Sequence, residues 1–264
     1  MWTHADGPGA TVARSLPYQD YNGRKDELPQ GAQLMCGRFF RHDVSWEEYY
    51  TGLRLIIPED VEPPEAAYNI APTQIAPIIR HPTEDEDADA GELVMEPARW
   101  GLVPTWWKKP LKEIKWGTFN ARSETTAEKP FFRGAFRHGR CLVPMSGFYE
   151  WKKTEDGTKQ PYAIGLGNVR WFCCAGLWSR AMIDGSEIDT FTILTTTPND
   201  LMAEIHNRMP VILSPTDYDH WLDPEKDAEP LFEPFAADAM QAWKVGKAVG
   251  NVRNQGAELA RAVD

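Results

Sequence analysis

Four short segments of this chain place reactive and charged side chains beside tryptophan, glycine and proline. They read MCGR (residues 35–38), TFNARSET (residues 118–125), VPMSGFYEW (residues 143–151) and EIHNRMP (residues 204–210). A cysteine thiol is a nucleophile, histidine and glutamate transfer protons, and arginine binds anions. The segments therefore contain the residue types of nucleophilic and acid-base chemistry.

Each candidate residue also has a purely structural explanation when it is taken alone. Cys36 could be a buried cysteine at a strand edge, Glu150 a solvated glutamate, and His206 a histidine that packs against or caps a helix. The remaining cysteines lie in apolar runs that predict buried strands: Cys141, Cys173 and Cys174. Because the chain has no Cys-x-x-Cys or Cys/His ligand spacing, no metal site is expected.

The net charge of −11 excludes a uniformly basic nucleic-acid coat, but the charge is segregated along the chain. Residues 84–96 contain seven acids and no base, whereas residues 99–140 contain ten bases and three acids. A fifth segment, RWGLVPTWW (residues 99–107), adds aromatic residues to the start of this basic stretch. The basic stretch is either a solvated face or an anion-binding surface.

The composition is that of a globular protein, with 42% hydrophobic and 25% charged residues among 264. It excludes a wholly disordered chain, a collagen and a coiled coil. No apolar run reaches the ~18–20 residues that span a bilayer. The first 34 residues lack the apolar core of a secretion signal. We therefore expect a soluble cytoplasmic protein that makes no membrane contact.

Short strands and a few helices must position the polar segments. We expect a helix from Ser45, with Ser45 as its N-cap, another over residues 198–208 and a short one over residues 216–222. Strands are expected over residues 75–79, 93–100, 140–151, 162–166, 171–178 and 190–196. Because strands and helices do not alternate, the pattern indicates an α+β fold with a mostly antiparallel, barrel-like β core and surrounding helices.

Composition divides the chain into three ranges. Residues 1–34 are rich in glycine, proline and polar residues, which predicts a disordered extension or a wrongly assigned start. Residues 35–251 are expected to form one domain, and residues 252–264 a C-terminal tail.

The polar segments resemble motifs of the SRAP (SOS response associated peptidase) family. Six motifs occur in the family's order: MCGR, YNIAPTQ (residues 68–74), RWGLVP, FNARSET, CLVPMSGFYEW and IHNRMPVIL. The resemblance implies the SRAP fold and a DNA-damage function, in which abasic sites in single-stranded DNA are bound covalently and protected. It also implies a monomer without metal or organic cofactor, which associates with the nucleoid when it binds DNA.

The resemblance assigns the nucleophile to Cys36, exposed as the N-terminus once Met35 is removed. Its α-amine would condense with the aldehyde of a ring-opened abasic sugar, and its thiol would close a thiazolidine. An α-amine, with a pKa of ~8 against ~10.4 for lysine, has the larger neutral fraction at pH 7. By the same resemblance Asn120 orients the amine or a sugar hydroxyl, Glu150 shuttles a proton, and His206 opens the sugar ring.

DNA contacts follow from the same motifs. Arg38, Arg122 and Arg208 each lie two residues after an implied catalytic residue, and residues i and i+2 of a strand share a face. Their guanidinium groups suit phosphate. Trp106 and Trp107 are expected to stack on bases, unless they are core aromatics.

The 34 residues before Met35 depart from the family pattern, because an attached extension would make the Cys36 nitrogen an amide. Three explanations compete: translation starts at Met35, the protein cleaves a propeptide, or the crosslinking chemistry is lost. We favour the first. Two other functions stay open, an N-terminal-nucleophile cysteine peptidase with His206 as base and a non-catalytic single-stranded DNA binder. Abasic-site lyase activity is a further expectation, because an imine at C1′ acidifies C2′.

Overall fold

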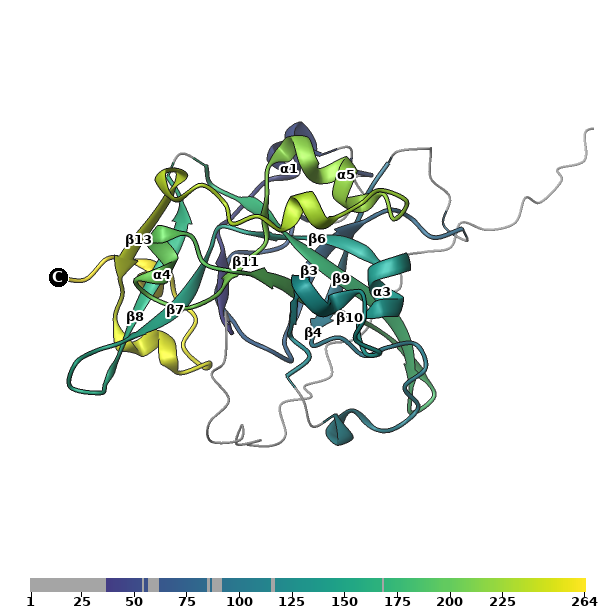
Figure 1. Cartoon of the computed structure of the whole chain (residues 1–264), viewed down its shortest axis with the longest axis horizontal. Coiled ribbons are helices and arrows are strands. Elements are labelled where there is room, and N and C mark those ends of the chain that lie inside the picture. Colours follow the sequence, from purple (N-terminus) through teal and green to yellow (C-terminus); the bar gives the residue numbers. More distant parts are fainter. Residues whose placement is uncertain are drawn as a thin grey trace, which may run out of the picture. The chain divides into compact units, whose positions relative to one another are not determined.

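The computed structural model describes residues 37–53, 55–56, 62–84, 86, 92–114, 117–167 and 169–264 (Figure 1). Cys36 and the extension expected over residues 1–34 lie outside the described residues.

Five strands close into a barrel in the order β10–β4–β3–β6–β9 and back to β10. They are β3 (Ile75–Arg80), β4 (Val94–Trp100), β6 (Arg140–Met145), β9 (Phe172–Ile183) and β10 (Ser186–Thr196). All neighbours in this ring are antiparallel except β4 and β10, which are parallel. The barrel-like, mostly antiparallel core expected from the sequence is confirmed.

The strands β9 and β10 extend beyond the expected ranges because a tight hairpin joins them. Ser186 pairs with Ile183, which leaves Asp184 and Gly185 as a two-residue turn. Both have positive φ, 51° and 82°, as a type I′ hairpin turn requires. The turn therefore fixes the register of the longest strand pair in the fold.

A second, open sheet has the antiparallel order β13–β8–β7–β1–β2. In Figure 1, β7, β8 and β13 lie to the left of the barrel strands. The strands are β1 (Phe39–Arg41), β2 (Ala67–Ile70), β7 (Gly147–Lys153), β8 (Lys159–Leu166) and β13 (Met240–Lys244).

The expectation of one continuous strand over residues 140–151 is wrong, because the chain passes from the barrel to the open sheet at Ser146. The Ser146 amide bonds the carbonyl of Phe40, and its hydroxyl accepts from the His42 amide. Gly147 has no room for a side chain, since a Cβ there would lie 2.4 Å from the Phe40 ring. Long-range packing against β1 thus creates a break that the local apolar pattern does not reveal.

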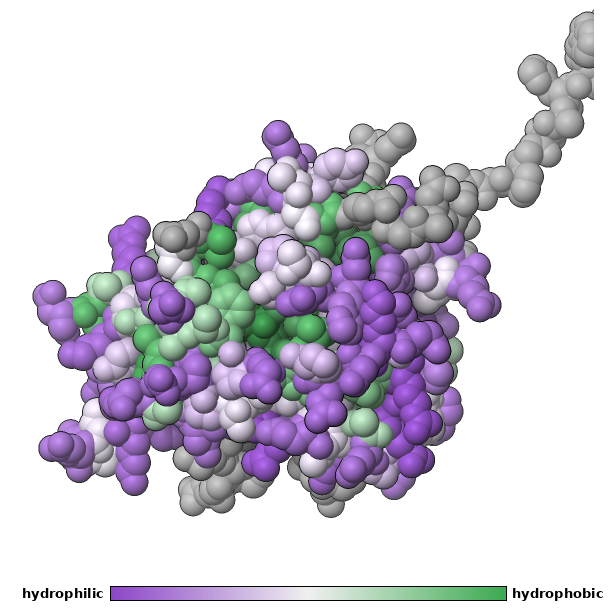
Figure 2. Space-filling view, turned by 45° about the horizontal axis from the view of Figure 1, so that its top comes forward, coloured by the Kyte–Doolittle hydropathy of each residue, from purple (hydrophilic) through white to green (hydrophobic). Residues whose placement is uncertain are grey.

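The barrel strands bury both faces. One face packs against the open sheet, in a cluster that joins Trp100 and Phe191 to Phe39 and Phe148. The other face packs under helices α1 (Trp46–Gly52) and α5 (Tyr218–Leu222). On the face drawn in Figure 2, hydrophobic residues reach the surface in a central band that hydrophilic side chains surround.

The helices are short. Ser45 is the N-cap of α1, as expected, and forms a capping box with Glu48. Two further helices are α2 (Ser123–Thr126) and α3 (Arg133–His138). The helix expected over 216–222 is present as the 3₁₀ turn Pro215–Asp217 followed by α5. Other 3₁₀ helices are Leu111–Glu113, Glu229–Phe232, Ala237–Ala239, Lys247–Gly250 and Ala257–Ala260.

The helix expected over residues 198–208 is wrong in length, because α4 covers only Asp200–Ala203. Beyond it the chain extends as β11 (Met209–Pro210) and β12 (Ile212–Leu213), which pair with β10 and β9. Val211 bonds both neighbours, donating to Leu194 and accepting from Ala175. Pairing within the barrel therefore overrides the local helical pattern.

Candidate active site

The candidate site is centred on Glu150 of β7, beside the strand that follows Cys36. Phe39 and Phe40 pair with Phe148 and Gly147, and the carbonyl of Arg38 accepts from the Tyr149 amide at 2.9 Å. The backbone of residues 38–40 therefore runs antiparallel to β7, and the Arg38 carbonyl bonds the residue that precedes Glu150.

Glu150 is buried, with 2% of its surface exposed. Its Oε1 lies 3.9 Å from Nδ1 of His206, and its Oε2 accepts from the Trp151 amide at 3.3 Å. The 3.9 Å separation is a close electrostatic contact that is longer than a hydrogen bond. The structure thus brings together the two residues predicted to transfer protons, from segments far apart in the sequence.

His206 follows the end of α4. Asn199 caps that helix by accepting from the Met202 amide, and the His206 amide bonds the Met202 carbonyl at 2.7 Å. The ring Nδ1 lies 3.2 Å from the Arg208 amide nitrogen. Nδ1 also lies 3.3 Å from the Arg208 carbonyl oxygen, so it accepts from the amide in one tautomer and donates to the carbonyl when it carries a proton. Nε2 is buried and has no hydrogen-bond partner within the part of the chain that the structure describes.

Asn120 opens β5 (Asn120–Arg122), which runs parallel to β10. Asn120 is half-buried, Ala121 is buried and Arg122 is exposed. The alternation agrees with the expectation that Asn120 and Arg122 share one face of a strand.

Arg208 is held by protein groups. Its guanidinium makes a two-pronged ion pair with Glu124, at 2.8 Å for Nη2 to Oε2, and donates to the Thr195 carbonyl at 2.5 Å. Hydrogen bonding to Arg208 is the main cause that lowers the pKa of Glu124. The pair links the FNARSET segment to the IHNRM segment. Sequence analysis missed Glu124 as this partner, although it lies within a motif that was identified.

Arg38 is also engaged. Its Nη1 donates to Asn69 Oδ1 and to the Val249 carbonyl, both at 2.8 Å, while Nη2 has one longer contact of 3.4 Å to Gly250. Of the three arginines predicted to bind phosphate, Arg122 alone is classed as exposed. Asn69, which is fully buried, was not identified as a site residue, although it lies in the YNIAPTQ motif.

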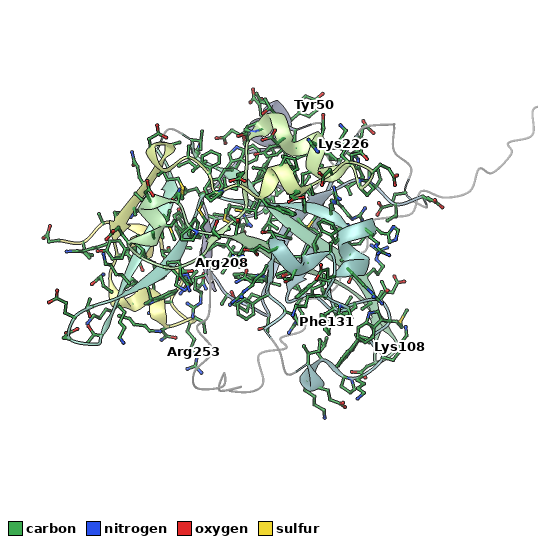
Figure 3. The ribbon with its side chains drawn as sticks, viewed as in Figure 1. Tyr50, Lys108, Phe131, Arg208, Lys226 and Arg253 are labelled. Carbon is green, nitrogen blue, oxygen red and sulfur yellow. The ribbon has the colours of Figure 1, made fainter. Side chains whose placement is uncertain are left out.

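The two adjacent tryptophans differ in exposure. Trp106 is 55% exposed, whereas Trp107 is 8% exposed and packs with Val103 and Ile183. Both rings contact Phe131. In Figure 3, Phe131 and Lys108 lie toward one edge of the molecule, away from the more central Arg208.

The basic stretch divides into structural and exposed residues. Arg140 is buried and donates to carbonyls that follow α5, and Arg99 lies near the Gly101 carbonyl, where burial lowers its pKa. Among the described residues of this stretch, the exposed bases are Lys108, Lys109, Lys112, Arg122, Lys129, Arg133 and Arg137. The local surplus of positive charge therefore belongs mainly to the surface.

Cys141, Cys173 and Cys174 are buried in barrel strands, as expected, and burial raises the pKa of Cys173 to about 12. Among the described residues, no group of histidine, cysteine, aspartate and glutamate could hold a metal ion. None of the helices in the described ranges is long and apolar enough to cross a membrane.

The fold and site define an α+β protein with a closed barrel and an attached open sheet. Its site holds a buried pair of a glutamate and a histidine from two distant segments of the chain. The family model of the SOS response associated peptidases (SRAP) matches residues 35–252. The chain belongs to the SRAP family.

Several relatives and solved structures are similar to the chain. "Abasic site processing protein YoqW" of Bacillus subtilis is 38% identical over 235 residues, covering 85% of this chain and 98% of that protein. "Abasic site processing protein YedK" of Escherichia coli is 33% identical, covering 87% and 100%. A crystal structure of a protein from Bacteroides thetaiotaomicron superposes with a TM-score of 0.65 at 27% identity, covering 84% and 92%.

Proposed function

We propose that this protein captures abasic sites in single-stranded DNA covalently, with Cys36 as its N-terminal residue after removal of Met35. Relatives with full-length similarity carry the name abasic site processing protein, and the family match begins at Met35. The observation that carries the proposal is the buried Glu150–His206 pair beside the strand that follows Cys36.

Chain connectivity supports a nucleophile at this place. Cys36 is bonded to Gly37, and consecutive Cα atoms are about 3.8 Å apart, so Cys36 lies at most two such steps from Arg38. Arg38 in turn bonds the residue that precedes Glu150. A nucleophile on so short a tether has a high effective concentration at the acid-base pair.

The chemistry balances with the loss of one water. The α-amine adds to C1′ of the ring-opened sugar, the carbinolamine loses water to give an imine, and the thiol sulfur adds to the imine carbon. Glu150 removes a proton from the nitrogen once the neutral amine has added to C1′ and returns it to the hydroxyl that leaves as water. The thiol proton passes to the nitrogen when the sulfur adds to the imine carbon. In its imidazolium form, His206 donates the Nε2 proton to the sugar ring oxygen while the C1′ hydroxyl loses its proton to water, which opens the ring to the aldehyde. Asn120 orients the amine through its side-chain amide.

The exposed groups support a path for single-stranded DNA. Arg122 can meet phosphate on the face that it shares with Asn120, and the Trp106 ring is accessible for stacking. Splayed bases are needed for stacking, which favours single strands. Arg38 keeps donors on Nη2 for a phosphate, whereas Arg208 would have to share its guanidinium with Glu124. We expect a monomer in the cytoplasm.

Intact mass spectrometry with a matched variant tests the proposal. The protein is incubated with an abasic single-stranded oligonucleotide, and Cys36→Ser is treated in parallel. We expect a chain that starts at Cys36 to gain the oligonucleotide mass less one water and to survive denaturation. The serine variant keeps an amine and can form an imine, but it cannot form the thiazolidine. An equally stable adduct with Cys36→Ser would contradict the proposed bond.

A further inference from the structure

Asn69 of β2 lies at a junction that the proposed chemistry does not use. Its side chain is fully buried, and its Oδ1 accepts from Arg38 Nη1 at 2.8 Å. Its Nδ2 lies within hydrogen-bond distance of the carbonyls of Val249, Asn251 and Asn254, at 3.2, 3.0 and 3.0 Å. The Asn69 side-chain amide therefore connects Arg38, the residue before β1, with a segment near the C-terminus.

Further contacts anchor the C-terminal segment beside and beyond this junction. The Gln255 side chain donates to the backbone carbonyl of Asn69 at 3.1 Å. Further on, Leu259 is 3% exposed and packs against the cluster of Phe40 and Tyr149, and the Trp243 indole donates to the Ala260 carbonyl at 2.8 Å. The segment is therefore a fixed support for Asn69. We refer to residues 249–255 as the C-terminal clamp.

The hydrogen bonds of Arg38 fix the orientation of its guanidinium group. Both hydrogens of Nη1 are used, on Asn69 and on Val249, and the guanidinium is planar. Fixing one edge of a planar group fixes the orientation of the other edge. Among the described residues, Nη2 has only the 3.4 Å contact to the Gly250 carbonyl, so it can still donate to a ligand.

We propose that Asn69 is a positioning residue, which together with the C-terminal clamp orients Arg38 for a DNA phosphate and holds the start of β1. This inference rests on the proposed function, because an oriented Arg38 serves abasic-site capture only if the protein binds DNA. Asn69 itself touches no DNA. It acts through Arg38, which lies two residues from the nucleophile.

A double-mutant cycle tests whether Asn69 acts through Arg38. Affinity is measured for a single-stranded oligonucleotide with a tetrahydrofuran abasic analogue, which lacks the aldehyde and cannot crosslink. We expect Arg38→Ala and Asn69→Ala each to weaken binding about tenfold, and the double variant to bind no more weakly than Arg38→Ala alone. Losses that multiply in the double variant would overturn the proposal, because Asn69 would then act independently of Arg38.

Two further variants separate positioning from general stability. Gln255→Ala removes an exposed side chain that supports Asn69, and we expect it to weaken binding in the wild-type background but not in Arg38→Ala. Trp243→Phe is the matched control, because it removes the indole bond to Ala260, beyond the C-terminal clamp, and keeps an aromatic ring in the cluster of Phe40 and Tyr149. We expect it to leave affinity unchanged. Equal losses from both variants would indicate a merely structural tail and contradict the proposal.

Amide hydrogen exchange gives a result that does not depend on DNA. In Asn69→Ala we expect exchange in Phe39–Arg41 to rise at least tenfold, with no change in α5. Unchanged protection of β1 would refute the positioning role even if the protein captures abasic sites. Raised exchange in a protein that forms no adduct would instead keep the positioning role and reject the proposed function.

Discussion

Replacing Glu124 tests whether the Arg208 ion pair ties two motifs of the site together. The Arg208 side chain is 10% exposed and the Glu124 side chain 46% exposed. Removing one partner of a fully buried pair costs about 3–5 kcal/mol, and exposed pairs contribute about 0–1 kcal/mol. For this half-exposed pair we expect Glu124→Ala to lower the free energy of unfolding by about 2 kcal/mol.

The assay is thermal unfolding of Glu124→Ala beside Glu128→Ala. Glu128 is an exposed acid four residues after Glu124, so both variants change the net charge equally. At about 2–4 °C per kcal/mol for a domain of this size, the loss lowers Tm by about 4–8 °C. We expect Glu128→Ala to change Tm by less than about 1 °C. Equal Tm values for the two variants would refute the role of the ion pair as an internal tie.

The pH dependence of the same variant has a defined sign. Arg208 lowers the pKa of Glu124 in the folded protein, so the pair stabilises the fold at pH values above the unfolded pKa of about 4.3. This contribution disappears as the pH falls and the folded carboxylate becomes protonated. The Tm difference between wild type and Glu124→Ala should therefore shrink as the pH falls below about 4. A difference that grows on acidification would contradict this linkage.

Four further substitutions test the proposed chemistry and the DNA path. Glu150→Gln should slow single-turnover crosslinking, read on denaturing gels, about 100-fold without lowering Tm; a change below threefold would remove Glu150 from the mechanism. Trp106→Ala should weaken single-stranded DNA binding about tenfold, whereas Trp107→Ala should instead lower the free energy of unfolding by about 3 kcal/mol. DNA titration and denaturant unfolding measure the two effects. Weaker binding in Trp107→Ala and lower stability in Trp106→Ala would contradict these two roles. Arg122→Ala should reduce the salt slope of binding by about 0.7, and an unchanged slope would exclude a phosphate contact.

The sequence predicted those features that depend on local pattern. Ser45 caps α1 because its hydroxyl and Glu48 are spaced for a capping box. Runs of apolar residues marked the barrel strands, and the absence of strand–helix alternation indicated an antiparallel core. Glu150 and His206 were identified through motifs and meet in the structure at 3.9 Å.

Features set by distant contacts could not be predicted in this way. The break at Ser146 depends on Phe40, more than a hundred residues earlier in the chain. The short α4 depends on the insertion of Val211 between β10 and β9. Arg208 looks like a free phosphate ligand in the sequence, because nothing local shows that Glu124 and Thr195 occupy its guanidinium.

The most direct test of the central claim is the intact mass of the natively expressed protein before and after incubation with an abasic single-stranded oligonucleotide. The account predicts a chain that begins at Cys36 and gains the oligonucleotide mass less one water. A chain that retains residues 1–34 and forms no adduct would contradict covalent capture by this form of the protein. An adduct on a chain with a blocked Cys36 nitrogen would contradict the assigned nucleophile.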